Sequence, residues 1–373
     1  MIQPLTGVRI VDAKVTTDAT SVHARDRFSV VVVGAGQAGL SAGFHLARRG
    51  IDFTILEASS RIGETWRRRW ESLRLFTPAR LDGLPGMPFP GRPDALPDKD
   101  QMAAYLDRYA EHFNLPIRFN AAVRELKRTG QTFELKTDHG VVEADQVVIA
   151  TGAHPVPRVP DFAGELDPSI LQLHSSEYRQ PVQLRPGGVL VVGAGNSGAE
   201  VAMDASNDHR VWLSGRCPGM NSAAIFSPPF WWLGTHLLTI KTPIGRRHAA
   251  SAKTKGTPRF RLGDRDFASA GISRVPRTTG VADGKPVLED GRVLDIANVV
   301  WCTGFDHDLS WIDLPGFDHL PHHQRGVVSS QPGLYFVGLP FQYGFSSALI
   351  DGVGRDARYI TERIFIRYRS ATP

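Results

Sequence analysis

The chain of 373 residues has only two cysteines, Cys217 and Cys302, and no CxxC motif. Without that motif, a redox dithiol and a cysteine-rich metal site are both excluded, so we expect no metal. Such sparse cysteine is typical of proteins in reducing compartments, which predicts a cytoplasmic protein without a disulfide framework.

Long apolar runs are also lacking. A membrane-spanning helix needs roughly 18–20 consecutive apolar residues. The nearest stretch, residues 223–240, is interrupted by Pro228, Pro229 and His236. Residues 1–27 lack the basic start and apolar core of a signal peptide and are predicted to form an N-terminal arm. We therefore expect no stable membrane insertion.

The chain also lacks a cluster of basic residues. The net charge is +5, but the arginines are scattered from Arg9 to Arg369 rather than gathered in one segment. This distribution does not indicate a nucleic-acid partner. Attraction to phosphate-bearing cofactors explains the basic balance equally well.

The first recognisable unit is a strand, a glycine loop, a helix and a second strand. Residues 28–33 read Phe-Ser-Val-Val-Val-Val, as in a buried parallel strand, and lead into Gly34-Ala-Gly36-Gln-Ala-Gly39. A helical pattern runs to Arg49, where Gly50 suits a helix C-terminus, and residues 52–57 form the next predicted strand.

The same order returns later in the chain. Residues 189–192 precede Gly193-Ala-Gly195-Asn-Ser-Gly198, a predicted helix and a strand over residues 210–214. Each unit also has a later partner strand ending in Thr-Gly, over residues 144–152 and 295–304. A composite pattern present twice predicts two Rossmann-like dinucleotide-binding domains in an α/β protein.

The glycine loops have a mechanical explanation. In such a loop the first glycine permits a tight turn, the second lets the backbone approach a pyrophosphate, and the third lets helix and strand pack closely. The phosphates then lie at the helix N-terminus, where free N–H groups favour negative charge.

The residue that ends each second strand distinguishes the two sites. Glu57 lies 23 residues after Gly34, and Arg216 lies 23 residues after Gly193. A carboxylate accepts hydrogen bonds from ribose hydroxyls but repels a 2′-phosphate, whereas a guanidinium binds that phosphate. The offsets therefore predict FAD in the first site and NADPH, rather than NADH, in the second.

With these motifs, the chain resembles the class B flavoprotein monooxygenases, which include flavin-containing and Baeyer–Villiger monooxygenases. Gly63-Glu-Thr-Trp66 is similar to the family's Gly-Gly-Thr-Trp segment, and residues 162–178 are similar to its F-x-G-x-x-x-H-x-x-x-[FYW] fingerprint. The resemblance covers residues 28–365. It implies a glutathione-reductase-like architecture and a flavin C4a-(hydro)peroxide that forms after hydride transfer from NADPH and reaction with O2.

The expected cofactor contacts follow from the loops, the offsets and the resemblance together. For FAD they are Gly34, Gly36, Gln37, Ala38, Gly39, Glu57, Ala58, Thr65, Trp66, Val123, Thr151, Gly152 and Gly338. For NADPH they are Gly193, Gly195, Asn196, Ser197, Gly198, Ser214, Arg216, Thr303 and Gly304.

Two candidates for a catalytic role remain. The family commonly places an Asn near the flavin in a segment similar to residues 75–78, where this chain has Thr77. His174 of the fingerprint is either a base or, as we favour, a residue that orients the domains or touches NADPH. Its fingerprint is irregular, because nine residues rather than three separate Gly164 from His174.

The domain boundaries are predicted from the Pro-rich stretch at 155–160 and from the second Thr-Gly strand. Residues 28–158 and 297–373 are assigned to the FAD domain, and residues 159–296 to an inserted NADPH domain. The sequence does not fix the oligomeric state, and a homodimer is compatible with it.

Three roles fit the apolar irregular stretch over residues 226–240, namely core packing, the lining of a substrate entrance, or contact with a membrane surface.

Three functions fit the chain as a whole. The favoured one is an NADPH- and O2-dependent monooxygenase acting on a small organic substrate. The second is an NADPH-dependent flavin reductase or oxidase that passes electrons to a quinone or a protein partner. The third, a non-enzymatic nucleotide sensor, is disfavoured because both glycine loops are intact.

Overall fold

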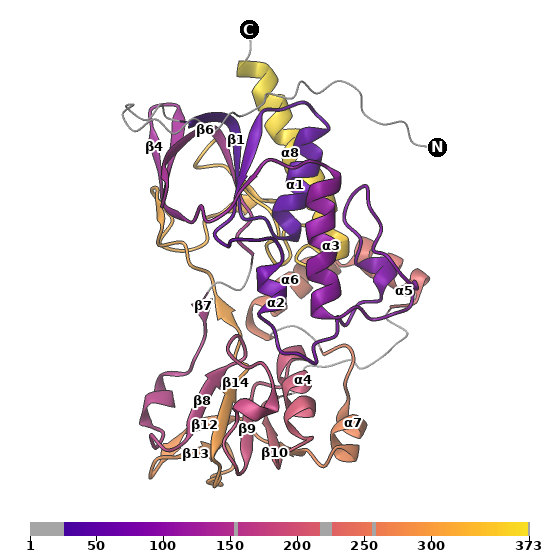
Figure 1. Cartoon of the computed structure of the whole chain (residues 1–373), viewed down its shortest axis with the longest axis vertical. Helices are drawn as coiled ribbons and strands as arrows, with labels where there is room; N and C mark the ends of the chain where they lie inside the picture. The colour runs from indigo at the N-terminus through magenta and orange to yellow at the C-terminus, as the bar shows by residue number, and fades with distance from the viewer. Residues whose placement is uncertain (1–25, 153–155, 217–225, 256–258, 372–373) are drawn as a thin grey trace.

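A computed structural model describes residues 26–152, 156–216, 226–255 and 259–371. The chain forms two α/β domains, one at each end of the long axis of the molecule (Figure 1). The expected N-terminal arm lies outside the described residues, except for Asp26 and Arg27, which begin the first strand. Cys217 also lies outside them.

The first domain is built on a ten-stranded sheet with its buried valine run at the centre. Its central order is β16-β4-β5-β6-β1-β2-β3, and β19 also pairs with β6. The strands are β1 (Asp26–Val33), β2 (Phe53–Leu56), β3 (Ile117–Arg118), β4 (Val123–Thr129), β5 (Thr132–Thr137), β6 (Gly140–Ile149), β16 (Ile312–Asp313), β17 (His323–Gln324), β18 (Val327–Val328) and β19 (Leu334–Phe336). Strands β1, β2, β6 and β19 run parallel, so their carboxyl ends meet at one edge.

Helices cover one face of this sheet (Figure 1). They are α1 (Gln37–Ala47), α3 (Lys99–His112) and α8 (Ile350–Ala371), with the short α2 (Glu64–Arg67) nearby. The start of α3 is fixed by a capping box: Asp98 accepts the Gln101 N–H at 2.8 Å, and the Gln101 side chain accepts the Asp98 N–H at 3.0 Å.

Ser346 and Ser347 precede the last helix without capping it, because α8 begins at Ile350. The Ser347 hydroxyl instead accepts the backbone N–H groups of Tyr343 and Gly344, because the chain makes an extra turn before the helix.

The second domain contains a five-stranded parallel sheet in the order β11-β10-β9-β14-β8. Its elements are β8 (Leu171–His174), β9 (Val189–Val192), β10 (Val211–Ser214), β11 (Ser273–Val275), β14 (Asn298–Trp301), α4 (Asn196–Ala205), α7 (Asp264–Ser269) and the hairpin β12 (Thr278–Ala282) with β13 (Lys285–Leu288). The predicted boundary at residue 297 needs correction. Strand β14 hydrogen-bonds between β9 and β8, so it belongs to the second domain.

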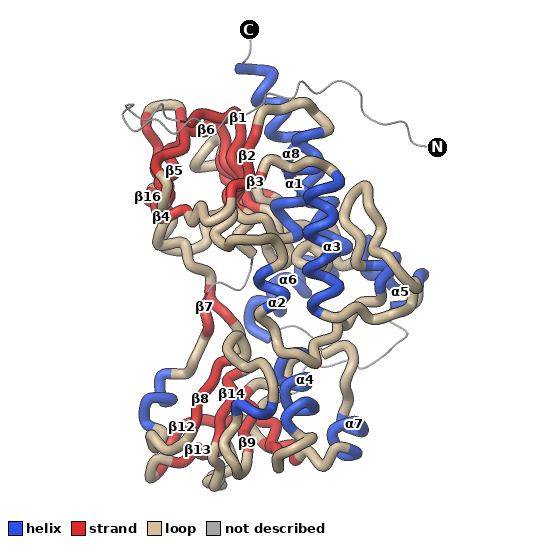
Figure 2. The backbone as a smooth tube through the Cα atoms, viewed as in Figure 1, coloured by secondary structure: helices blue, strands red, loops and turns tan. Residues whose placement is uncertain are grey.

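Two chain segments cross between the domains side by side. They form an antiparallel pair of β7 (Val156–Pro157) and β15 (Phe305–Asp306) (Figure 2). An ion pair between Arg158 and Asp306 joins the same two segments. The predicted domain crossing near residues 155–160 therefore lies beside a second crossing, where the chain returns to the first domain after β14.

A helical insertion leaves the second domain after β10 and packs on the first. It contains α5 (Pro228–Leu237) and α6 (Pro243–Lys255). The Trp231 indole N–H donates to Asp351 of α8 at 2.9 Å, and the Ile240 N–H donates to the Tyr343 carbonyl at 2.8 Å. Contacts thus place the insertion with the first domain, although chain order places it within the second.

None of the helices in the described parts of the chain is both long and apolar enough to cross a bilayer. The described side chains also include no group of three or more His, Cys, Asp or Glu residues arranged to hold a metal ion.

Candidate functional site

In the first glycine loop, neither of the two outer glycines has room for a side chain. Gly34 has φ +103°, and a Cβ there would lie 2.6 Å from the Ala150 carbonyl oxygen. A Cβ at Gly39 would lie 1.8 Å from the Gly34 carbonyl oxygen. Only glycine fits at either position, because the turn is tight and the helix packs directly on the strand.

The second loop repeats this geometry. Gly193 has φ +108°, and its Cβ would lie 2.2 Å from the Cys302 carbonyl oxygen. A Cβ at Gly198 would lie 1.7 Å from the Gly193 oxygen. Ala150 and Cys302 each precede the Thr-Gly ending of a partner strand, so the internal repeat seen in the sequence is also a repeat in space.

The middle glycines differ from the outer ones because they face open space. A Cβ at Gly36 or Gly195 would meet nothing within 4 Å. These two residues are the N-caps of α1 and α4, and neither helix start has a side-chain cap. Each loop therefore leaves a cradle at a helix N-terminus that fits the pyrophosphate of a dinucleotide.

Glu57 is held at the end of β2 by the first loop itself. Its carboxylate accepts the Ala35 N–H at 2.7 Å and the Ser59 N–H at 2.9 Å. The Glu57 carbonyl also accepts the Ala121 N–H at 2.9 Å, which places the segment leading to Val123 beside it. Glu57 therefore lies next to the loop, and Ala58 beside it is exposed.

Other predicted FAD residues gather at the same edge of the sheet. Thr151, Gly152 and Gly338 line one recess at the ends of β6 and β19. A Cβ at Gly338 would lie 3.0 Å from the Cβ of Ala38 in α1, so this recess adjoins the first loop.

Thr65 and Trp66 lie in α2. Thr65 is exposed, and Trp66 is half-buried and packs on the hydrophobic core. Glu64, which replaces the family's glycine, forms ion pairs with Arg61 and Arg68 on the surface.

At the second site, the two predicted residues after β10 behave differently. Ser214 is fully buried, and its hydroxyl contacts the Pro276 carbonyl at 2.9 Å and Thr278 at 2.8 Å. Its side chain therefore faces the protein rather than a nucleotide. Arg216 is exposed and forms an ion pair with Glu289 at 3.3 Å. An exposed pair of this kind stabilises by only about 0–1 kcal/mol, so a phosphate can displace it.

A second arginine at this position was missed by the sequence analysis. Arg274 of β11 donates to the Gly215 carbonyl at 2.9 Å. Its guanidinium therefore lies beside the backbone that leads from Gly215 into Arg216. It comes from a strand that pairs in parallel with β10, so no sequence spacing reveals it.

The remaining second-site residues lie around the loop and the end of β14. The Asn196 side-chain oxygen accepts the Phe260 N–H at 3.0 Å, and Ser197 is half-buried in the first turn of α4. Thr303 donates its hydroxyl to the Arg158 carbonyl in the domain crossing, and Gly304 has φ +90° with open space at its Cβ position.

His174 ends β8 and is buried. Its Nδ1 accepts the Ser176 N–H at 3.2 Å, so the proton is on Nε2, which donates to the Gly304 carbonyl at 3.1 Å. The ring also contacts Phe305 edge-on at 4.8 Å. Burial lowers the pKa of His174. Both nitrogens are engaged at the domain crossing, which favours an orienting role over that of a base.

Thr77 has an acidic partner that the sequence analysis did not identify. Its hydroxyl donates to Asp82 at 2.5 Å, and both residues are buried. The other carboxyl oxygen of Asp82 has no hydrogen-bond partner among the described residues. Burial, with a contribution from Asp351, raises the pKa of Asp82 to about 7 despite the bond from Thr77. At neutral pH the Asp82 carboxyl is therefore divided about equally between its protonated and ionised forms.

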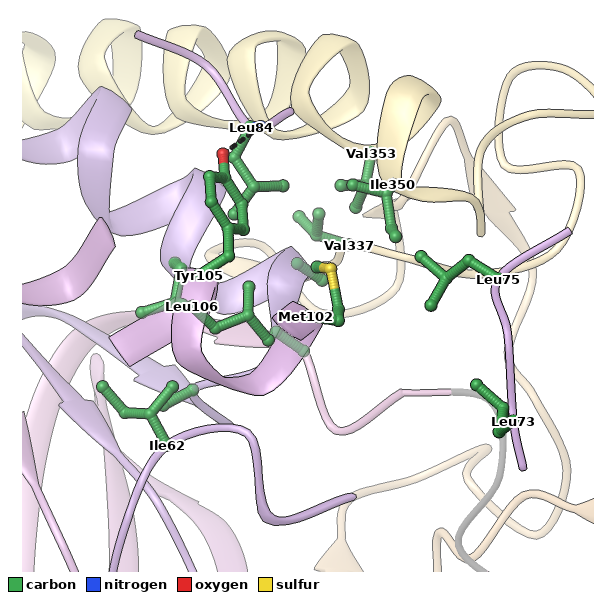
Figure 3. Close-up of a cluster of buried hydrophobic side chains, with 14 of the residues drawn as sticks. Ile62, Leu73, Leu75, Leu84, Met102, Tyr105, Leu106, Val337, Ile350 and Val353 are labelled. Carbon is green, nitrogen blue, oxygen red and sulfur yellow. Dashed lines mark hydrogen bonds between the residues drawn. The ribbon is translucent and has the colours of Figure 1, made fainter. Parts of the chain in front are cut away.

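The segment carrying Thr77 is fixed by the hydrophobic core (Figure 3). Leu73 and Leu75 face Met102 of α3 and the cluster formed by Val337 and the first turns of α8. After the segment turns, the Tyr105 hydroxyl accepts the Leu84 N–H at 2.6 Å.

Asp82 gives the stability of the protein a specific pH dependence. Because the folded-state pKa is raised from 3.8 to about 7, its contribution is fully present below about pH 4 and is lost as the pH rises towards 7. An Asn side chain cannot ionise, so in Asp82→Asn the fall in the free energy of unfolding between low pH and pH 7 should be smaller by on the order of 2–4 kcal/mol. Thermal unfolding from pH 5 to 8 measures the effect. The exposed control Asp318→Asn should follow the wild type, and parallel pH curves for all three proteins would contradict the assignment.

Aromatic rings connect the two domains beside Thr77. Phe76 lies 5.1 Å from Phe260, Phe260 lies 6.0 Å from Phe226, and Phe226 lies 5.7 Å from Trp231, measured between ring centroids. Trp231 in turn lies 5.3 Å from Phe345. We call these five residues the aromatic wall. It runs from the Thr77 segment to Phe260, which is bonded to the second glycine loop through Asn196.

Comparisons with known proteins agree with this geometry. Residues 31–224, which include both glycine loops, match the family model described as pyridine nucleotide-disulphide oxidoreductase. A CzcO-like oxidoreductase from Geobacillus kaustophilus is 41% identical over 344 residues, covering 90% of this chain and 97% of that protein. The probable indole-3-pyruvate monooxygenase YUCCA3 from Arabidopsis thaliana is 29% identical over 391 residues, covering 91% and 87%.

A solved structure is also similar. The flavin-containing monooxygenase from Stenotrophomonas maltophilia superposes with a TM-score of 0.76 at 25% identity, covering 92% of this chain and 99% of that one.

Proposed function

Because the chain belongs to the pyridine nucleotide-disulphide oxidoreductase family and, within it, to the class B flavoprotein monooxygenases, we propose that it oxygenates a small apolar organic molecule with NADPH and O2. The observation that carries this proposal is the pair of open cradles at Gly36 and Gly195, each at a helix N-terminus without a side-chain cap. Two dinucleotide sites allow hydride transfer between cofactors, and the aromatic wall supplies an apolar surface that reaches the second loop through Phe260 and Asn196.

FAD is assigned to the first site. Glu57, fixed by the Ala35 N–H, presents a carboxylate for ribose hydroxyls, and the cradle at Gly36 fits the pyrophosphate. FAD, when bound, supplies hydride acceptance and activation of oxygen. The protein supplies binding, orientation and exclusion of water.

NADPH is assigned to the second site. Arg216 and Arg274 place two guanidinium groups near the end of β10, where the 2′-phosphate of NADPH would lie. Asn196, Ser197 and the open position at Gly195 complete the cradle for its pyrophosphate.

Arg216→Ala should lower kcat/KM for NADPH by about 10- to 100-fold and change that for NADH less than about twofold. The reason is that only NADPH carries the 2′-phosphate. Steady-state oxidation of the two nucleotides measures the ratio. Arg292→Ala, which removes another exposed arginine of the second domain, serves as the control. Unchanged selectivity in Arg216→Ala would reject the assignment.

The aromatic wall favours a planar, apolar substrate. Phe260 and Trp231 are buried, whereas Phe76, Phe226 and Phe345 are half-buried and retain surface for contact. Offset and edge-on contacts with such rings stabilise aromatic molecules. Relatives named as indole-3-pyruvate monooxygenases are compatible with a substrate that carries a planar aromatic ring.

Thr77 and Asp82 are assigned to the reacting region. The hydroxyl of Thr77 is fixed by its bond to Asp82, so its lone pairs can accept a hydrogen bond at a constant position. Asp82 acts as a positioning residue that fixes the Thr77 hydroxyl. His174 is assigned to the orientation of the domain crossing.

The second candidate function is an NADPH-dependent flavin reductase or oxidase that passes electrons to a quinone or a protein partner. The same two cradles would serve it, and the family description includes disulphide reduction. Reduction of a disulphide through the chain's own cysteines is disfavoured, because no CxxC is present and burial raises the pKa of the Cys302 thiol to about 12.

The deciding experiment measures NADPH oxidation with a panel of indoles, ketones, amines and sulfides. Products and hydrogen peroxide are quantified in each reaction. The monooxygenase proposal expects a substrate for which oxygenated product approaches the NADPH consumed. If hydrogen peroxide or a reduced quinone accounts for all the NADPH with every compound, the second candidate is correct.

A further inference from the structure

Helix α5 and the start of α6 carry a concentration of exposed apolar side chains. Twelve large hydrophobic residues are exposed among the described residues, and five of them lie between positions 230 and 244. They are Phe230 (57% exposed), Trp232 (60%), Leu233 (45%), Leu237 (42%) and Ile244 (59%). Phe230, Leu233 and Leu237 have the spacing of one helix face.

The other side of α5 is firmly attached to the first domain. Trp231 is 6% exposed, donates its indole N–H to Asp351 and contacts Phe226 and Phe345. Helix α5 lies at the outer edge of the molecule (Figure 1), and its exposed apolar residues are therefore presented by an anchored helix. Water contact with so many apolar groups in one place is unfavourable and indicates an interaction surface.

The chain segment that carries this surface holds charge of one sign, and Asp351 of α8 is the acidic residue that accepts the Trp231 indole N–H from outside that segment. Residues 209–263 contain no Asp or Glu but nine cationic residues: Arg210, Arg216, Lys241, Arg246, Arg247, Lys253, Lys255, Arg259 and Arg261. Among them, Lys241, Arg246 and Arg247 are exposed next to the apolar residues. We call Phe230, Trp232, Leu233, Leu237, Ile244, Lys241, Arg246 and Arg247 the α5–α6 face.

We propose that the α5–α6 face docks reversibly on the surface of an anionic lipid membrane. A helix with Trp, Phe and Leu on one side and neighbouring Lys and Arg residues suits the boundary between lipid headgroups and acyl chains. Trp232 and Phe230 would enter the apolar boundary, while Arg247 and Lys241 would contact anionic headgroups.

A second copy of the chain fits this face less well. A symmetric dimer would place Lys241, Arg246 and Arg247 against the same residues of the other copy, and no acidic residue between positions 209 and 263 would offset that repulsion. An anionic lipid surface provides both negatively charged headgroups and an apolar acyl-chain region. The inference does not depend on the proposed reaction, because docking involves residues outside the two cradles.

Sedimentation with lipid vesicles tests the proposal on the full-length, FAD-loaded protein. We expect it to bind vesicles containing phosphatidylcholine and phosphatidylglycerol at low salt, and to bind phosphatidylcholine vesicles much less. High salt should weaken the binding, because it screens the cationic groups. Trp232→Ser should lower affinity by at least about tenfold, since a large exposed ring loses its apolar contact. Arg247→Glu should do so by about tenfold.

Matched controls use residues elsewhere on the surface. Val182→Ser removes a side chain that is 79% exposed, and Lys136→Glu reverses an exposed charge on β5. Both should bind vesicles as the wild type does. Absence of vesicle binding at low salt, or equal losses in the controls, would overturn the proposal. So would a result in which Trp232→Ser changes a dimer to a monomer without affecting vesicles. None of these outcomes bears on NADPH oxidation, which is measured separately.

Discussion

Gly36→Val is expected to give a folded but colourless protein. A Cβ at Gly36 meets no protein atom within 4 Å, and its φ of −73° suits any L-residue, so folding tolerates the substitution. The valine side chain would, however, occupy the cradle at the start of α1 where the pyrophosphate must approach the backbone. FAD affinity should fall by at least about 100-fold. The ratio of flavin to protein absorbance after purification with added FAD measures the loss.

Two further substitutions make this result specific. Gly280→Val on β12 also enters open space but lies far in sequence from either loop, so it should retain full flavin. Gly39→Ala should instead destabilise the fold, because its Cβ would lie 1.8 Å from the Gly34 oxygen. A yellow Gly36→Val protein with normal flavin content would show that the first loop does not hold the pyrophosphate.

Gly195→Val is expected to give a yellow protein that hardly uses NADPH. The same open space and an ordinary φ of −77° apply at the start of α4, so the protein should fold and bind FAD normally. The side chain would block the second cradle, and kcat/KM for NADPH should fall by at least about 100-fold. Anaerobic reduction of the bound flavin by NADPH measures the effect.

Reduction of the flavin by dithionite provides the control for this variant. It should proceed as in the wild type, because it needs no nucleotide in the second site. Loss of flavin from Gly195→Val, or normal reduction by NADPH, would reject the ordered assignment of FAD to the first loop and NADPH to the second.

The parts of the fold that could be predicted from the sequence depend on short-range spacing. Each glycine loop, its strand and its helix are consecutive in the chain, so the turn requirements of Gly34 and Gly193 are visible in the sequence. The offset to Glu57 is also local, and in the structure its carboxylate accepts the Ala35 N–H of the first loop.

The errors and omissions concern contacts between distant segments. Sequence spacing could not show that β14 inserts between β9 and β8, which moves the predicted boundary at residue 297. It could not show that the Ser214 hydroxyl is used by Pro276 and Thr278, or that β11 places Arg274 beside Gly215.

Asp82 is a different case, because it lies only five residues after Thr77. Its nearness to Thr77 could be expected from the sequence, but its raised pKa could not. The raised pKa arises from burial under the packed core and from Asp351, far along the chain. Of the three roles considered for residues 226–240, the structure places Trp231 in a packing role and leaves Phe230 and Trp232 exposed.

The insertion that carries α5 links the two domains through the ring of Phe260. Phe226 is held on the first domain by a hydrogen bond between its carbonyl and Arg80, and Phe76 is also part of that domain. Both rings contact Phe260, which is bonded to the second domain through Asn196. Any rotation that withdraws the second domain therefore separates Phe260 from both partners at once. Under the proposed function, release of the nucleotide and opening of the aromatic wall would then share one movement.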